Sequence, residues 1–276
     1  MIVAGGEAPR DGSGLPLLSL KDINRLPGEE KEAVYRRLIP AEVFARTGID
    51  PMSLKDAKGR ALARFICPEG IGLLRIELRR DPDDRDCVFF VEIADTPFGQ
   101  IELSFCLVND PDAPRFDIDR DPRGRANDFG TVRRNIPEEI AAMQAGLSPN
   151  QVRRGLKIFS PFFCRFERFV KALGIATVVA EPLSYNNAIR YERYGFDYIT
   201  GKQLMLWIDR EFRPGGILFN RLDGSTPFRQ PGMEKTVRGR SWAIHDGILE
   251  RPWDGVKIYK IPGVDAGVDT FPGRRF

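Results

Sequence analysis

The sequence predicts an α/β fold in which helices flank a mixed, mostly antiparallel sheet. Three patterns support this prediction. Apolar and polar residues alternate through three stretches between residues 74 and 107 that short turns connect, which is typical of an antiparallel meander. Phenylalanines recur every three or four residues from Phe159 to Phe169, as in an amphipathic helix. The continuous apolar run 175–180 then indicates a strand covered on both faces, and with it one parallel connection.

The segment before the meander is expected to be mainly helical. The first dozen residues, with Gly and Pro concentrated around Pro9 to Gly14, predict a frayed arm, and the apolar residues 15–20 predict a short strand. Helices are expected over residues 29–38 and 41–46, because charged residues separate the apolar positions there and Gly48 provides a stop signal.

The meander and the residues after it contain the first candidate site residue, Glu102. Strands are predicted at residues 74–78, 87–93 and 101–107. In the third strand, alternation places Glu102, Ser104 and Cys106 on the face opposite Ile101, Leu103, Phe105 and Leu107. A helix is then expected over residues 137–145. Another is expected from Ser148 and Pro149, because these residues favour the N-cap and the first helical position.

Two segments do not follow these periodicities. Residues 109–136 alternate Asp with Arg and predict a long, charged, exposed excursion inserted into the domain. Residues 213–276 are rich in Pro and Gly between short apolar groups. They predict an extension with short strands that packs on the core or on a partner.

Composition excludes several classes of site. The single histidine, His245, rules out sites that need several histidines, and we expect it to be a structural or surface residue and not a catalyst. The four cysteines form no Cys-x-x-Cys pair, so no metal ribbon or thiol redox motif is expected, and Cys106 and Cys164 are predicted to be buried. With 42 basic and 39 acidic residues the net charge is +3, so no nucleic-acid partner is expected. No basic leader or run of ~20 apolar residues is visible, which predicts a cytoplasmic protein without a membrane partner.

Residues 186–196 read NNAIRYERYGF, and this segment resembles the GNAT acyltransferases. In that family an Asn, an Ala, a Tyr-Glu-Arg or Tyr-Glu-Lys and a final Gly-Phe mark the helix after the fifth strand. An apolar strand containing Met follows in the family, and residues 204–208, LMLWI, occupy that place here. The order of predicted elements also agrees. The resemblance covers roughly residues 15–210 and implies a GNAT-like domain at residues 15–212.

The resemblance implies that acetyl-CoA or another acyl-CoA binds where the sheet opens between its fourth and fifth strands. Backbone N–H groups at the start of the long helix would hold the pyrophosphate, since a helix N-terminus offers unpaired donors and partial positive charge. The family pattern Gln/Arg-x-x-Gly-x-Gly/Ala falls near residues 151–157, but Gln151 lies one position early and Lys157 replaces the last small residue. If the helix instead starts at Ser160 and Pro161, the phosphate site moves toward Phe159 or is lost. The implied cofactor-binding residues are Gln151, Arg153, Arg154, Gly155, Lys157 and Asn187.

The implied reaction transfers the acyl group directly from the thioester to an amine. A lysine-like amine has a pKa near 10.4, so a carboxylate is expected to take up its proton. By the resemblance, Tyr191 would protonate the departing thiolate, with Tyr194 as the alternative. Glu102 would be the base, and Glu92 and Glu181 are its rivals.

The sequence thus leads to the hypothesis of an acyl-CoA-dependent N-acyltransferase that needs no metal and acts on a small-molecule or peptide amine. Two alternatives stay open. The protein could be a GNAT-fold binding or assembly module that has lost catalysis. It could also take its acyl group from an acyl-carrier protein, which the arginines of residues 115–134 would contact. The extension 213–276 could support a homodimer.

Overall fold

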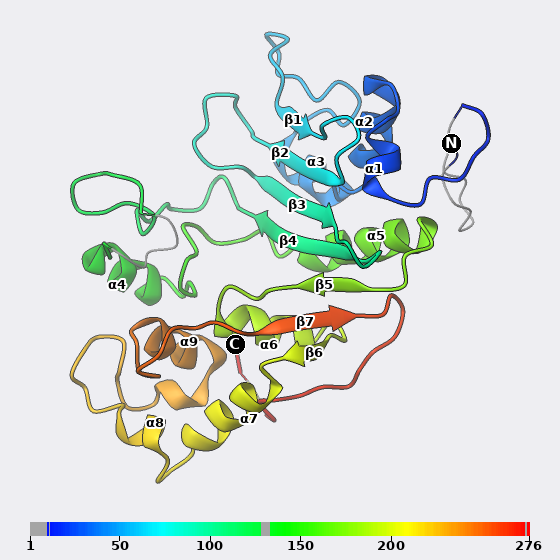
Figure 1. Ribbon diagram of the computed structural model, residues 1–276. Coiled ribbons are helices and arrows are strands. Elements are labelled where there is room, and N and C mark those ends of the chain that lie inside the picture. The colour runs from blue at the N-terminus through cyan, green and yellow to red at the C-terminus, as the bar shows by residue number, and fades with distance from the viewer. Residues whose placement is uncertain (1–9, 11, 128–132, 274) are drawn as a thin grey trace. The chain divides into compact units, whose positions relative to one another are not determined.

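The computed structural model (Figure 1) describes residues 10, 12–127, 133–273 and 275–276. These residues form two compact units. Unit 1 comprises Met1–Asp112, Gly155–Ala180 and Ile261–Val264, and unit 2 comprises Ala113–Arg154, Glu181–Lys260 and Asp265–Phe276. Most of the predicted N-terminal arm, and residues 128–132 of the predicted excursion, lie outside the described residues. Unit 2 includes residues on both sides of position 212, where the sequence analysis placed a domain limit.

Unit 1 contains a mixed sheet, as the sequence predicts. Its described strands follow the order β1-β2-β3-β4-β5. Neighbours from β1 to β4 pair antiparallel, and β4 pairs parallel with β5, so the meander and the parallel connection are confirmed. β1 is an additional strand that the alternation did not reveal. The strands are β1 (Ala63–Ile66), β2 (Leu73–Leu78), β3 (Phe89–Asp95), β4 (Ile101–Val108) and β5 (Val178–Ala180).

The predicted helices of unit 1 are present, but the predicted strand at residues 15–20 is wrong. Leu20 instead begins a short helix. The hydroxyl of Ser19 accepts a hydrogen bond from Asp22 N at 3.1 Å. The carboxylate of Asp95, distant in sequence, accepts from Leu20 N and Lys21 N at 3.1 and 2.9 Å. Carboxylate capping of the first N–H groups favours the helix. The helices are α1 (Leu20–Ile23), α2 (Gly28–Arg36), α3 (Ala41–Thr47) and α5 (Phe159–Ala172).

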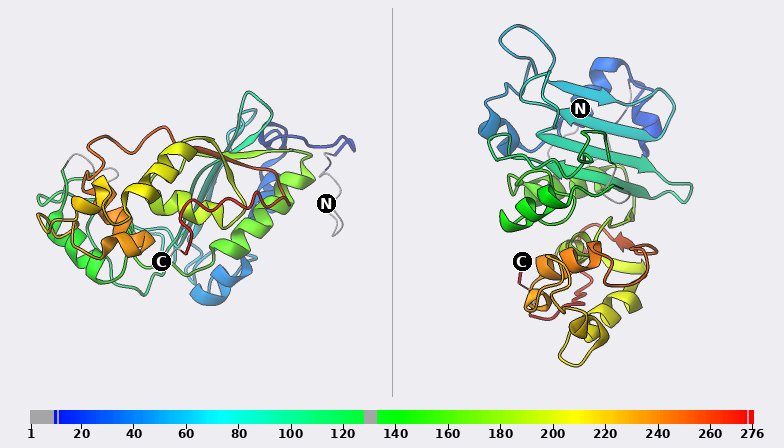
Figure 2. Two further views of the ribbon diagram at one scale, coloured as in Figure 1. Left: turned by 90° about the horizontal axis from the view of Figure 1, so that it is seen from below. Right: turned by 90° about the vertical axis from the view of Figure 1, so that its left-hand side faces the viewer.

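Aromatic side chains of α5 form the centre of the core of unit 1. Phe162 and Phe166 are fully buried. The Phe162 ring meets the Phe89 ring of β3 edge-on, with centroids 5.6 Å apart. Farther along α5, Phe169 lies 6.3 Å from Tyr35 of α2, measured between ring centroids. The two helices therefore cover the same face of the sheet (Figure 2).

The helix expected to start at Ser148 and Pro149 is absent, and residues 148–158 form a connecting segment. Asn150 and Lys157 have φ values of 65° and 60°, in the left-handed region that a right-handed helix cannot contain. The side chain of Gln151 accepts a hydrogen bond from Ser148 N at 2.7 Å, which closes a local turn in place of a helix. The long helix begins only at Phe159.

The regular elements of unit 2 are mainly helices, and its described residues contain one antiparallel strand pair, β6 with β7. The predicted helix at residues 137–145 is confirmed as α4. No helix in the described part of either unit is long and apolar enough to cross a membrane. The elements of unit 2 are α4 (Ile136–Gln144), α6 (Tyr185–Glu192), β6 (Asp197–Thr200), α7 (Lys202–Glu211), α8 (Ile217–Asn220), the 3-10 helix η2 (Met233–Lys235), α9 (Val237–His245) and β7 (Lys257–Lys260).

One expectation for the C-terminal half is wrong, and another is confirmed only in part. The apolar run 204–208, expected as a strand, lies in α7. Met205 and Ile208 are buried three positions apart while Leu206 is 44% exposed, which is a helical period. The region after residue 213, expected to hold short strands, contains the helices α8, η2 and α9 and, among its described residues, one strand. The apolar group around Ile258 does form a strand, β7.

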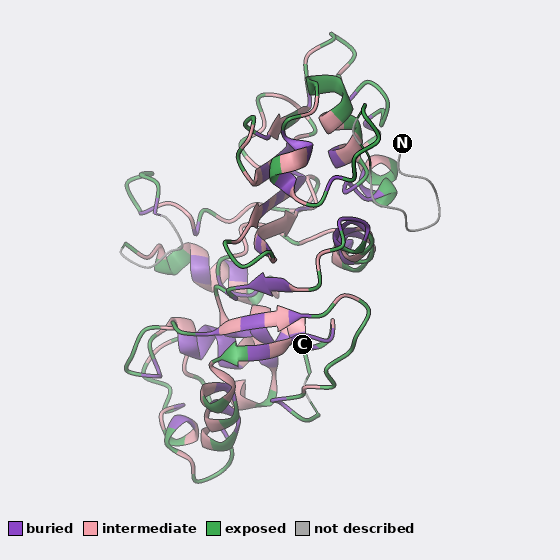
Figure 3. Cartoon of the chain, turned by 45° about the vertical axis from the view of Figure 1, so that its right-hand side comes forward, coloured by how far each residue is buried: buried purple, intermediate pink, exposed green. Residues whose placement is uncertain are grey.

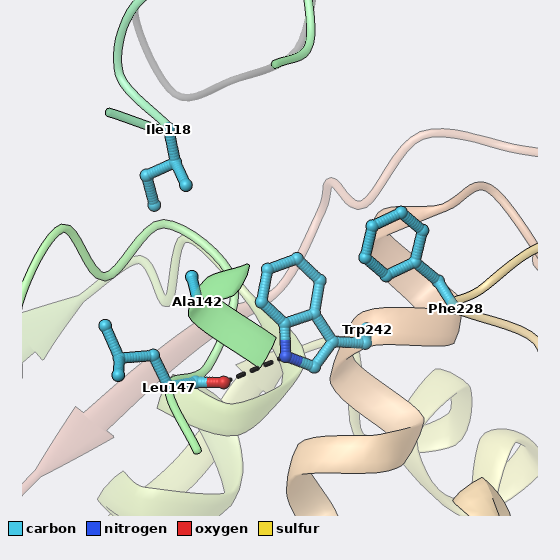
Figure 4. Packing of buried hydrophobic residues seen from close by; sticks show 5 residues of the cluster. All are labelled: Ile118, Ala142, Leu147, Phe228 and Trp242. Carbon is cyan, nitrogen blue, oxygen red and sulfur yellow. Dashed lines mark hydrogen bonds between the residues drawn. The ribbon is translucent and has the colours of Figure 1, made fainter. Parts of the chain in front are cut away.

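The charged excursion is not wholly exposed, because part of it enters the core of unit 2. Ile118 packs in a cluster with Ala142, Leu147, Phe228 and Trp242 (Figure 4). Trp242 stacks on Phe228 with ring centroids 5.2 Å apart, and its indole N–H donates to the Leu147 carbonyl at 2.9 Å. The apolar residues between the charges thus anchor the excursion to unit 2.

Candidate functional site

The sheet of unit 1 opens between β4 and β5. Their pairing covers Ile101 with Val178 and Glu102 with Val179, although β4 continues to Val108. The three residues of β5 are buried (Figure 3). Within the described strand order β4 has only β3 and β5 as neighbours. The edge of β4 beyond Glu102 therefore has no continuing strand in the described part of unit 1, and this is where the resemblance leads one to expect a cofactor.

A β-bulge changes which side chains accompany Glu102. Leu103 lies opposite Ile93 and Phe105 lies opposite Glu92, so Ser104 is an extra residue on β4. An extra residue reverses the alternation that follows it. Phe105 and Leu107 therefore share the face of Glu102, contrary to the predicted alternation. The Phe105 ring also meets the Phe90 ring edge-on at 5.5 Å.

The three candidate bases differ in their ion pairs. The Arg75 guanidinium binds Glu92 at 2.6 Å through Nε and at 2.5 Å through Nη2. Glu181 belongs to unit 2, is exposed, and pairs with Lys257 at 3.0 Å. Glu102 is half-buried and accepts a hydrogen bond from the Ser104 hydroxyl at 3.3 Å. Among the residues that the structure describes, no basic side chain pairs with Glu102, which leaves its carboxylate open to an amine.

The loop that enters α5 begins against the end of β4. A Cβ atom on Gly155 would lie 2.8 Å from the carbonyl oxygen of Val108, so only glycine permits this approach without a shift. Lys157 is exposed, and its backbone is in the left-handed region that favours glycine. Pro161 is the third residue of α5 and contributes no N–H group. The N-terminus of α5 thus offers fewer backbone donors than an ordinary helix.

The other three predicted phosphate-loop residues belong to unit 2. Gln151 uses its side-chain oxygen in the turn at Ser148. The guanidinium of Arg153 donates to the Ala113 carbonyl at 3.1 Å, while Arg154 is exposed. The unit boundary falls between Arg154 and Gly155. Within unit 1, the structure brings Gly155 and Lys157 together, and it assigns the two arginines and Gln151 to the other unit.

Tyr191 and Asn187 lie on α6 of unit 2. The Tyr191 ring packs against Phe196 with centroids 4.9 Å apart. The Asn187 side-chain oxygen accepts a hydrogen bond from the Asn186 amide at 3.1 Å. Ser184 is the N-cap residue of this helix. Both residues follow it, in the segment that carries the family resemblance. Their predicted roles as proton donor and pantetheine contact stay predictions.

Sequence reasoning missed the buried carboxylate of Glu192, the residue after Tyr191. It accepts hydrogen bonds from the Tyr198 hydroxyl at 2.6 Å and the Thr270 hydroxyl at 2.5 Å, and from Thr270 N at 3.2 Å. Burial raises the pKa of Tyr198, and the charge of Glu192 raises it further. These bonds attach the C-terminal residues to α6. The only signal in the sequence was the position of Glu192 inside the motif.

A second group of charges in unit 2 surrounds Arg134, whose guanidinium bridges Glu139 and Asp246 at 2.5 and 2.7 Å. His245 Nε2 lies 3.3 Å from Glu139 Oε1. Burial alone would raise the pKa of the Glu139 carboxyl, but hydrogen bonds from His245 and Arg134 outweigh burial and hold it below its usual value. The contacts of His245 agree with the expected structural role. Across the described ranges, no three His, Cys, Asp or Glu side chains are grouped to hold a metal ion.

The chain was compared with protein-family models, with curated protein sequences and with solved structures. None of these comparisons gives a match. A function is therefore inferred from the chain's own residues.

Proposed function

We propose that the protein is an acyl-CoA-dependent N-acyltransferase of GNAT type that transfers an acetyl or longer acyl group directly to an amine. The observation that carries the proposal is the opening of the sheet after Glu102, where β4 runs on to Val108 without β5. An extended pantetheine arm can hydrogen-bond to a strand edge of this kind. The resemblance of residues 186–196 supports the same reading.

The cofactor's phosphates would lie at the loop between Gly155 and the start of α5. The backbone can approach a ligand closely at Gly155, and the positive end of the helix dipole favours an anion. Lys157 adds an exposed ammonium group two residues before the helix. A cation here compensates for the N–H group that Pro161 does not supply.

Glu102 would serve as the base, because the amine must be neutral to attack the thioester carbonyl. The carboxylate takes up the amine proton, the C–N bond forms as the C–S bond breaks, and the thiolate of CoA takes up a proton. Tyr191 is the proton donor that the resemblance implies. Phe105 and Leu107, on the Glu102 face, would exclude water from the reacting atoms.

Binding and turnover are tested separately. Acetyl-CoA and longer acyl-CoAs should stabilise the protein by about 2.7 kcal/mol at a hundredfold excess over Kd. Cys164, predicted to be buried, is exposed. Amide formation on a panel of amines is therefore followed by mass spectrometry, because this thiol would react with a thiol reagent. A flat thermal response across the acyl-CoA panel would refute the proposal.

Glu102→Gln should lower turnover by roughly 10²–10⁴-fold, the usual contribution of a positioned base, while leaving the thermal shift intact. Glu30→Gln, on the exposed side of α2, is the matched control and should turn over like the wild type. Cofactor binding without turnover on any amine would favour the binding or assembly alternative, in which catalysis has been lost.

A further inference from the structure

The exposed side of α5 carries a stripe of basic side chains. The buried side of the helix holds its phenylalanines, and Ser160, Cys164, Arg168 and Lys171 are exposed on the other side. Arg165 borders this exposed side of the helix and is half-buried. The spacing of three to four residues keeps Arg168 and Lys171 on one face of the helix. We call Arg165, Arg168 and Lys171 the α5 basic stripe.

Over the described ranges, the α5 basic stripe has no carboxylate partner. The acidic residue of the helix, Glu167, accepts a hydrogen bond from Gly263 N at 3.1 Å. Cations of a folded surface that lack local partners create a positive potential toward solvent. The stripe is therefore available to an external anion.

The arginines of the charged excursion behave differently. Arg115 pairs with Asp117 and Asp119, and Arg125 pairs with Asp121 at 2.7 Å. Arg133 and Arg134 also pair with carboxylates, so four of the six arginines in residues 109–136 have a neutralising partner. If the protein docks an acidic partner, α5 offers a better surface than the excursion that the sequence suggested.

The size and composition of the stripe indicate the kind of partner. Arg165 and Lys171 lie roughly 9 Å apart along the axis, from a rise of about 1.5 Å per residue. The exposed residues of α5 that precede the cations, Ser160 and Cys164, are small and offer no apolar group to insert into lipid. Nucleic-acid binding would be expected to need a larger excess of positive charge than the net +3 of this chain. A short row of carboxylates on one protein helix fits this length and charge.

We propose that the α5 basic stripe docks an acidic carrier protein that presents the acyl group on a phosphopantetheine arm. The inference rests on the proposed acyltransferase function and names a second donor for it. CoA and such a carrier share the phosphopantetheine thioester and differ in what is attached to its phosphate. The stripe follows the helix end proposed for that phosphate, so a docked carrier can extend its arm to the same loop.

The reaction with a carrier has the same balance as with CoA. The thioester C–S bond breaks, the amide C–N bond forms, and the proton lost by the amine leaves the thiol of the phosphopantetheine arm protonated. No oxidant or reductant is needed. Only the surface that holds the donor differs, and this difference makes the inference testable by charge reversal.

The test compares two donors on two charge-reversed variants. Octanoyl-loaded type II acyl-carrier protein and octanoyl-CoA are offered to the wild type, to Arg168→Glu with Lys171→Glu, and to the control Lys55→Glu with Lys58→Glu. The control lysines are exposed residues of unit 1 away from α5. Activity is measured as kcat/KM at low ionic strength and at about 0.15 M salt. Binding of the unacylated carrier is measured alongside.

The α5 variant should lose about tenfold in kcat/KM and in affinity for the carrier, and keep its kcat/KM for octanoyl-CoA. The control variant should keep both. Salt should weaken the carrier reaction more than the CoA reaction. This pattern supports the inference because damage to the fold or to the thioester site would reduce both donors equally.

Other outcomes overturn it. Equal loss with both donors assigns the stripe to the thioester site or to stability, and no loss with either removes its role. Transfer from octanoyl-CoA alone refutes the carrier and leaves the proposed function standing. If neither donor reacts, the proposed function fails. Docking is then judged by binding alone: salt-sensitive binding of the carrier that the α5 variant loses supports it, and its absence refutes it. If duplex DNA or phosphatidylserine vesicles bind the wild type as tightly as the carrier does, and the α5 variant loses that binding, the stripe is assigned to those anions instead.

Discussion

The buried charges around Arg134 allow a quantitative test of the stability of unit 2. Glu139→Gln keeps the shape of the side chain and removes its charge. The Glu139 side chain is 2% exposed and lies 2.5 Å from Arg134 Nη2. Breaking a buried ion pair by removing one partner costs about 3–5 kcal/mol. Because Arg134 keeps Asp246 at 2.7 Å, we expect the lower end of this range, about 3 kcal/mol.

The assay is unfolding by heat or urea with tryptophan fluorescence. All three tryptophans, Trp207, Trp242 and Trp253, belong to unit 2, so this signal reports that unit. A loss of about 3 kcal/mol corresponds to a fall in Tm of roughly 6–12 °C at about 2–4 °C per kcal/mol. The control is Glu250→Gln, because Glu250 pairs with Arg221 at 2.5 Å but its side chain is 69% exposed. Such a surface pair contributes about 0–1 kcal/mol.

The pH dependence provides a second readout with a defined sign. The folded-state pKa of Glu139 is lowered, since its hydrogen bonds outweigh the effect of burial. Its stabilising contribution is therefore present above the usual glutamate pKa of about 4.3 and is lost as the pH falls through the folded-state value. The difference between wild type and Glu139→Gln should shrink on acidification. A Tm equal to that of the Glu250 control, or a difference that acid leaves unchanged, would refute the reasoning.

Three further predictions concern unit 1. Lys157→Gly should raise the free energy of unfolding by about 0.5–1 kcal/mol, because φ is positive at this residue, and an unchanged value would contradict this argument. The same variant loses the ammonium group and should bind acetyl-CoA more weakly in calorimetry. Gly155→Ala should lower the free energy of unfolding by about 1–3 kcal/mol and abolish the thermal shift with acetyl-CoA, because its Cβ would lie 2.8 Å from the Val108 carbonyl oxygen. A melting curve equal to that of the wild type would exclude that contact. Iodoacetamide should modify the exposed Cys164 in the native protein and spare Cys67, whose pKa burial raises, and equal labelling in mass spectrometry would disprove the assigned burial.

The sequence predicts elements well where burial has a regular period. The apolar faces of α2, α5 and the strands of the meander recur at the spacing of their own structure, so local pattern and tertiary burial agree. The prediction from sequence fails at α1, because the Asp95 carboxylate that caps this helix comes from a distant part of the chain. It also fails at α7, whose short apolar run fits a strand equally well until burial shows the helical period.

The candidate site is less predictable than the fold because it depends on irregularities. A regular strand would place Glu102 and Phe105 on opposite faces, and the extra residue Ser104 places them on the same face. Ser104 has no feature that distinguishes it from an ordinary strand residue in the sequence. The close approach of Gly155 to Val108 is equally invisible, because residues 113–154 separate the two positions and belong to unit 2. In the sequence, only the family pattern distinguishes Gly155 from other glycines.

The connection from β4 to α5 links the proposed cofactor site to the folding of unit 2. Within unit 1 this connection consists of residues 109–112 and 155–158, and the segment between them folds with unit 2. Unfolding of unit 2 releases the segment that joins the two parts of this connection along the chain. Glu139→Gln should therefore lower the temperature at which acetyl-CoA binding is lost by about as much as it lowers the tryptophan transition, although Glu139 lies in unit 2. Binding that persists above the tryptophan midpoint would show that unit 1 holds the loop alone.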